Sequence, residues 1–146
     1  MEFWTSTHWA LLALFCPLAA ALLIALFPGV RRRGTPAAWL SISAAVVALS
    51  SALVLLAGQL GEPGTLVVET ARWLPEAGEL AASVGVRLDG ISVAMLTLVT
   101  GVATAVQVFS LGYMSGETRP AFGRYYGDHS LFIFSMSLLV LAQNLL

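Results

Sequence analysis

The sequence contains no lysine, and only 10% of its 146 residues are charged. The chain has seven arginines and eight acidic residues, so it lacks the excess of basic residues that a nucleic-acid-binding surface requires. Hydrophobic residues make up 58% of the chain, and its charged fraction lies well below the roughly 25% of soluble domains. We therefore predict an all-α integral membrane protein that lies in a lipid bilayer, and we expect no nucleic-acid partner.

Residues for catalysis or metal binding are also lacking. Cys16 is the only cysteine, so the chain cannot build a disulfide or a cysteine metal site. No nucleophile–base pair, metal-ligand cluster or phosphate loop is recognisable. We therefore predict no catalytic, cofactor-binding or metal-binding residues in this chain.

Four long apolar runs are present, at residues 9–27, 39–56, 91–111 and 130–146. None of them contains Asp, Glu, Lys or Arg, although proton pumps usually need such groups within the membrane. The 21 residues of 91–111 rise about 31 Å, which matches a hydrocarbon core of about 30 Å. We predict four transmembrane helices. The last run has only 17 residues and no polar flank, so we expect the natural protein to continue.

Three positions invite either a functional or an ordinary interpretation. Asp89 could carry protons, but just before a helix an aspartate ordinarily caps free backbone N–H groups. Gln107 could line a hydrated path or bond to a neighbouring helix. His129 beside Asp128 could take up protons, or it could be an interfacial polar residue like His8. The ordinary interpretation is favoured in each case.

Small residues at helical spacing predict faces on which helices pack closely. In the third run these are Gly101 and Ala105, with Thr97, Thr100, Thr104 and Gln107 nearby. In the second run they are Ser41, Ala45, Ala48 and Ala52. In the first run Ala13, Ala21 and Ala25 share a face with Pro17, which could bend the helix.

The loops predict the orientation. Residues 61–87 are polar and contain two β-favouring stretches, 65–73 and 80–88, separated by a turn signal at 75–78, so we predict a small β-hairpin there. Five arginines lie in loops 28–38 and 112–128, against two in 61–87. By the positive-inside rule, loops 28–38 and 112–128 are cytoplasmic in the inner (plasma) membrane, and the N-terminus is outside. Phe122, Tyr125 and Tyr126 predict an interfacial aromatic belt.

The series LDGISVAMLTLVTGV, FSLGYMSGE, RYY and SLFIFSMSLLVLAQNLL over residues 88–146 resembles the early part of subunit L, the antiporter-like membrane subunit of NADH:quinone oxidoreductase (respiratory complex I). Residues 1–87 resemble that family only in pattern. The resemblance implies a membrane-arm subunit of the proton-pumping module. It implies other complex I membrane subunits as partners, and it implies that NADH, FMN, iron-sulfur clusters and quinone are bound elsewhere.

Residues 1–146 would be the N-terminal part of such a subunit. In the family the proton path depends on a glutamate in a Gly-Trp-Glu motif after the fourth span and on later lysines, none of which this chain contains. We therefore expect the chain alone to be inactive. Gln143 stands where the family often has Asp, and glutamine cannot titrate. The large subunit of a multisubunit cation/proton antiporter stays an alternative, as does a non-enzymatic membrane scaffold.

Overall fold

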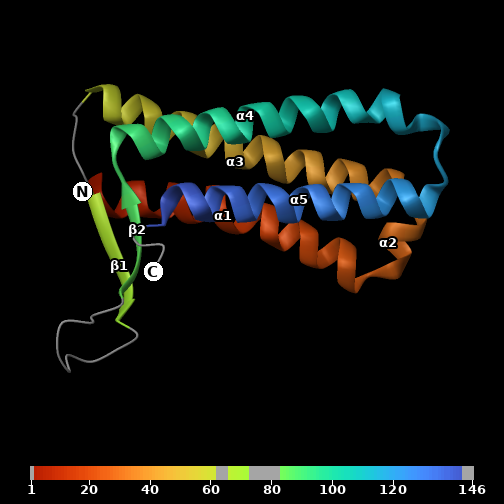
Figure 1. The fold of residues 1–146 in the computed structure, drawn as a ribbon, viewed down its shortest axis with the longest axis horizontal. Coiled ribbons are helices and arrows are strands. Elements are labelled where there is room, and N and C mark those ends of the chain that lie inside the picture. The colour runs from red at the N-terminus through yellow and green to blue at the C-terminus, as the bar shows by residue number, and fades with distance from the viewer. Residues whose placement is uncertain (1, 62–65, 73–82, 143–146) are drawn as a thin grey trace.

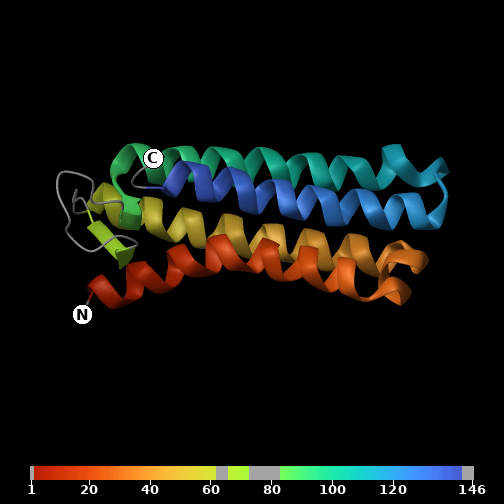
Figure 2. The same cartoon turned by 60° about the horizontal axis from the view of Figure 1, so that its bottom comes forward.

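The long helices of the described part of the chain lie side by side and form a bundle (Figures 1 and 2). The computed structural model describes residues 2–61, 66–72 and 83–142. The elements are α1 (Glu2–Leu26), α2 (Pro28–Arg33), α3 (Thr35–Gly61), β1 (Leu66–Arg72), β2 (Ser83–Leu88), α4 (Gly90–Tyr113), the 3-10 helix η1 (Met114–Gly116) and α5 (Arg119–Leu141). The predictions for the turn at 75–78 and for Gln143 lie outside the described residues.

The predicted number of four membrane spans is wrong. Within the part of the chain that the structure describes, three helices are long and apolar enough to cross a membrane: Thr7–Leu26, Thr35–Gly61 and Gly90–Gly116. The fourth long helix, α5, begins at Arg119 and carries Arg124 and Asp128 in its first half. Its apolar part, 130–141, rises only about 18 Å, which is short of the roughly 30 Å of a hydrocarbon core. Among the described residues the fold is therefore a bundle of three candidate spans with α5 packed along them.

The polar segment between α3 and α4 contains two strands. β1 and β2 pair antiparallel, with Leu66 opposite Leu88 and Arg72 opposite Ser83, and the register shifts between Glu69 and Ala71. Both strands lie within the stretches 65–73 and 80–88 that the sequence predicted. They lie at the end of the bundle where α3 ends and α4 begins, and α2 and η1 lie at the opposite end (Figure 1).

Part of the predicted loop 28–38 is instead a short helix. Pro28 occupies the first turn of α2, where its missing N–H costs nothing, and Gly34 ends the helix with a φ of 73°. A Cβ at Gly34 would lie 2.9 Å from the carbonyl oxygen of Arg119, so this turn packs directly on the start of α5. α3 can then begin at Thr35, earlier than the predicted residue 39.

The small-residue face predicted for the second run is confirmed. Ser41, Ala45, Ala48 and Ala52 are all at most 1% exposed on α3. Ala45 packs with Ala103 of α4 and Ile133 of α5 in one apolar cluster. Because these side chains are small, three helix backbones can approach α3 closely.

The faces predicted for the other two runs are only partly right. On α4, Ala105 is exposed, and the buried face is instead formed by Val93, Leu96, Thr100, Ala103, Thr104, Gln107 and Ser110. On α1, Ala13, Pro17 and Ala21 are buried, whereas Ala25 is exposed. Pro17 lies inside α1, which bows along its length (Figure 2). In both helices the four-residue spacing drifts off the buried face, because a helix turns once every 3.6 residues.

The capping role predicted for Asp89 is confirmed, and it gives a first testable expectation. The Asp89 carboxylate accepts a hydrogen bond of 2.7 Å from the Ser92 backbone N–H at the start of α4. We expect Asp89→Ala to lower the free energy of unfolding by about 1 kcal/mol, because it leaves a helix N–H without its cap. Asp89→Asn keeps the acceptor and should retain stability in detergent unfolding titrations. Equal losses in both variants would show that the negative charge, and not the cap, matters.

Candidate functional site

Four buried polar side chains meet where α3, α4 and α5 pack together. We call Ser41, Gln107, Tyr126 and Ser130 the polar junction. All four are at most 1% exposed. Ser41 lies on the small-residue face of α3, Gln107 lies on the buried face of α4, and Tyr126 and Ser130 are one turn apart on α5. Their helices therefore place them in one layer of the bundle.

Ser41 is the centre of the polar junction. Its hydroxyl accepts a hydrogen bond of 2.7 Å from the Gln107 amide Nε2. The same oxygen lies 2.6 Å from the Ser130 hydroxyl and donates to the backbone carbonyl of Tyr126 at 3.1 Å. A serine hydroxyl has one donor and two acceptor positions, so Ser130 must be the donor in its pair with Ser41. One serine thus connects three helices.

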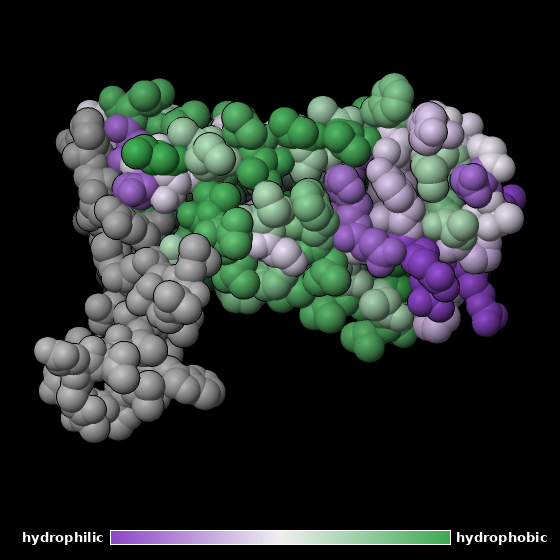
Figure 3. Space-filling model, viewed as in Figure 1, coloured by the Kyte–Doolittle hydropathy of each residue, from purple (hydrophilic) through white to green (hydrophobic). Residues whose placement is uncertain are grey.

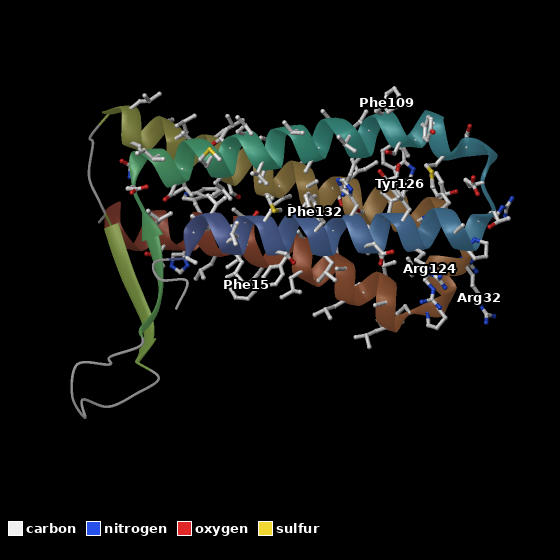
Figure 4. The ribbon with its side chains drawn as sticks, viewed as in Figure 1. Phe15, Arg32, Phe109, Arg124, Tyr126 and Phe132 are labelled. Carbon is white, nitrogen blue, oxygen red and sulfur yellow. The ribbon has the colours of Figure 1, made fainter. Side chains whose placement is uncertain are left out.

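Tyr126 joins the polar junction to an aromatic group. Its hydroxyl donates a hydrogen bond of 3.0 Å to the backbone carbonyl of Gln107. Its ring packs against Phe122 and Tyr125, with centroid distances of 5.0 and 5.3 Å, and against Ala38 on α3. Figure 4 shows Tyr126 between the ribbons of α4 and α5. The predicted interfacial belt is therefore wrong for Tyr126, because its ring fills the interior of the bundle.

Asp128 and His129 are neighbours on α5 that differ in burial. Asp128 is exposed, whereas the Nε2 atom of His129 is buried and has no hydrogen-bond partner among the described residues. The imidazole stacks on Tyr125 at a centroid distance of 5.8 Å. The imidazole also lies 6.0 Å from the Phe132 ring, and the interfacial position of His129 stays a prediction.

The chemistry of the polar junction is that of hydrogen bonding. It consists of hydroxyl groups and one amide, which exchange hydrogen bonds without carrying net charge at neutral pH. The interhelical hydrogen bond predicted for Gln107 is confirmed, because Nε2 reaches Ser41 on α3. The amide oxygen Oε1 of Gln107 is buried without a partner among the described residues. The junction is suited to fixing the register of three helices.

Metal binding has no visible basis in the described part of the chain. There, no three His, Cys, Asp or Glu side chains gather closely enough to hold a metal ion. Cys16 is a free, half-buried thiol on α1. The prediction that the chain holds no catalytic, cofactor or metal residue stays a prediction.

The chain is similar to known subunits of NADH-quinone oxidoreductase (complex I). Residues 73–126 match the family model described as NADH-Ubiquinone oxidoreductase (complex I), chain 5 N-terminus. NADH-quinone oxidoreductase subunit L of Mycobacterium tuberculosis is 35% identical over 141 residues, which cover 94% of this chain and 22% of that protein. Subunit L of Pseudomonas aeruginosa is 37% identical over 106 residues, covering 71% of this chain and 17% of that protein.

A relative described as chain 5 is also similar to this chain. NADH-ubiquinone oxidoreductase chain 5 of Metridium senile is 33% identical over 135 residues, which cover 92% of this chain and 22% of that protein. The chain thus spans about a fifth of the length of the curated relatives that it matches. The similarity includes α3, α4 and most of α5, and therefore the helices that build the polar junction.

Proposed function

We propose that this chain, which belongs to the subunit L (chain 5) family of complex I, is part of the membrane arm of a proton-translocating NADH:quinone oxidoreductase. The observation that carries this proposal is the 35% identity to a subunit L over 94% of the chain. The three apolar helices support a multi-pass membrane protein. Oxidation of NADH by quinone would take place in other subunits, which would also hold the NADH, FMN, iron-sulfur and quinone sites.

Within such a complex this chain would have a structural role in the proton-pumping module, and other segments would transfer the protons. The three spans in the described residues contain no Asp, Glu, Lys or Arg, so they offer no titrating group of those types at mid-membrane. The polar junction would hold α3, α4 and α5 in fixed register. Apolar side chains cover much of the face that Figure 3 shows, and they would contact lipid or neighbouring membrane subunits.

Purification from native membranes tests this proposal. The protein, tagged at a terminus and extracted in mild detergent, is expected to co-purify with NADH-oxidising and quinone-binding subunits, identified by mass spectrometry. A tagged unrelated membrane protein of similar abundance serves as the control. Co-purification with cation/proton antiporter subunits alone would overturn the assignment to complex I, and so would purification without partners.

We also propose that the N-terminus faces outward in the plasma membrane and that loops 28–38 and 112–128 are cytoplasmic. The strand pair and the α2 and η1 segments lie at opposite ends of the bundle, so they should lie on opposite sides of the membrane (Figure 1).

Cysteine labelling tests this orientation. In a Cys16→Ser background, Gly61→Cys at the end of α3 should react with a membrane-impermeant maleimide on intact cells, because it lies outside. Ser115→Cys in η1 should react only after permeabilisation. The reverse pattern would show that the orientation is inverted.

A further inference from the structure

Five arginines gather at one end of the bundle. Arg31, Arg32 and Arg33 form the last turn of α2, and Arg119 and Arg124 lie in the first two turns of α5. All except the half-buried Arg31 are exposed. Figure 3 shows a continuous hydrophilic patch at this end, and Figure 4 shows Arg32 and Arg124 extending on the same side of it. We call this group the arginine patch.

Two glycines bring the separate parts of the arginine patch together. A Cβ at Gly123 on α5 would clash with the carbonyl oxygen of Arg31 and would lie 3.0 Å from its Cα. A Cβ at Gly34 would lie 2.9 Å from the carbonyl oxygen of Arg119. The backbones of α2 and α5 are therefore in direct contact, and arginines about 90 positions apart in the sequence become neighbours.

The arginine patch keeps a positive excess. Glu117 and Asp128 are the acidic residues nearest to it in the sequence, both exposed, so the five arginines retain a net charge of +3. The patch lies beside the ends of the candidate spans at Leu26, Thr35 and Gly116. In a bilayer, the ends of spanning helices lie at the level of the lipid headgroups. Guanidinium groups bind phosphate oxygens through paired N–H donors, and they do so best where several converge.

We propose that α2 and the start of α5 form a binding site for an anionic phospholipid, whose phosphate group Arg32 and Arg124 bind together. Gly123 is a positioning residue, because it lets α2 pack on α5 and so keeps the two arginines close enough to bind the same phosphate. The site does not depend on the proposed role in complex I, since it rests on the arginine patch and the span ends alone.

Native mass spectrometry of the full chain in detergent tests the site. We expect retention of phosphatidylglycerol but not of phosphatidylcholine, and no displacement by inorganic phosphate at millimolar concentration. Equal retention of both lipids would overturn the proposal. Complete displacement by inorganic phosphate would overturn the choice of a lipid as ligand.

Charge-removing variants show whether the two arginines share one ligand. Arg32→Gln and Arg124→Gln should each weaken phosphatidylglycerol binding about fivefold, the usual effect of one basic residue near an anionic surface. If both bind the same phosphate, the double variant should lose only about tenfold, less than the product of the two single losses. If the loss of affinity in the double variant equals the product of the two single losses, the two arginines act as independent surface charges. Arg87→Gln on β2 removes the same charge at the other end of the bundle and should have no effect.

A glycine substitution tests the geometry without changing charge. Gly123→Ala should force α2 away from α5 and weaken lipid binding about as much as the arginine double variant. Gly112→Ala is the matched control, because a Cβ there meets no atom within 4 Å. Helix content from circular dichroism should stay the same in both variants. Full binding by a folded Gly123→Ala variant would show that α2 and α5 act separately and would refute the shared site.

Discussion

Replacing Tyr126 by alanine is expected to lower the free energy of unfolding by about 3–5 kcal/mol, the largest effect of a single truncation in the bundle. Tyr126 is the largest fully buried side chain among the described residues, with 0% of its surface exposed. Its loss leaves a cavity between Ile42 of α3, Phe122 and Tyr125. It also removes the hydrogen bond to the Gln107 carbonyl, which joins α5 to α4.

Two further variants separate the causes of this effect. Tyr126→Phe keeps the ring and loses only the hydroxyl, so it should cost about 1 kcal/mol. Tyr113→Ala removes a ring that is 78% exposed and should stay within about 0.5 kcal/mol of the parent. All three are compared by detergent unfolding titrations in bicelles. A small loss for Tyr126→Ala, similar to that for Tyr113→Ala, would show that α5 is loosely packed in solution.

The sequence was informative where one local rule decides the structure. The uncharged run 91–111 predicts a helix, and Asp89 before it predicts a cap, because both depend on residues within a few positions. Alanines and serine at three- and four-residue spacing on α3 predict a closely packed face for the same reason. These predictions need no knowledge of what packs against the helix.

The rest depends on contacts between distant segments. The segment that contains Tyr126 is rich in aromatic residues, which is typical of an interfacial belt. Tyr126 is a core residue only because it packs against Ala38 and Ile42 of α3. A signal was present, since the buried residues Gly123, Tyr126, Ser130, Ile133, Ser137 and Leu141 recur at three- to four-residue spacing. The helix therefore starts near Arg119, well before the apolar run, and the count of spans based on apolar length alone was wrong for it.

The short helix α2 illustrates the same limit. Its six residues are too few to be stable as an isolated helix, so its conformation depends on the contact of Arg31 with Gly123 on α5. Sequence patterns within 28–38 indicate a turn, and the chain does turn at Gly34. The patterns cannot show that this turn packs on a segment far along the chain.

Replacing Ser41 by alanine should lower the free energy of unfolding by about 2 kcal/mol, because it leaves the buried Gln107 Nε2 and the Ser130 hydroxyl without their partner. In a membrane environment such groups have no water to bond with, although single interhelical hydrogen bonds there average only about 0.6 kcal/mol. The larger value follows because Ser41 serves two side chains. Ser43→Ala removes an exposed hydroxyl that bonds within its own helix at 2.9 Å, so it should change stability little.

A double variant decides whether unpaired polar atoms cause that loss. Gln107→Leu removes the Nε2 donor and also the Oε1 atom that has no partner, so alone it should be close to neutral. In that background Ser41→Ala no longer strands the amide, and its cost should fall by about 1 kcal/mol. Additive losses would mean that Ser41 acts through packing on the small-residue face of α3. A reduced cost would show that the hydrogen bond between Ser41 and Gln107 holds α3 and α4 together.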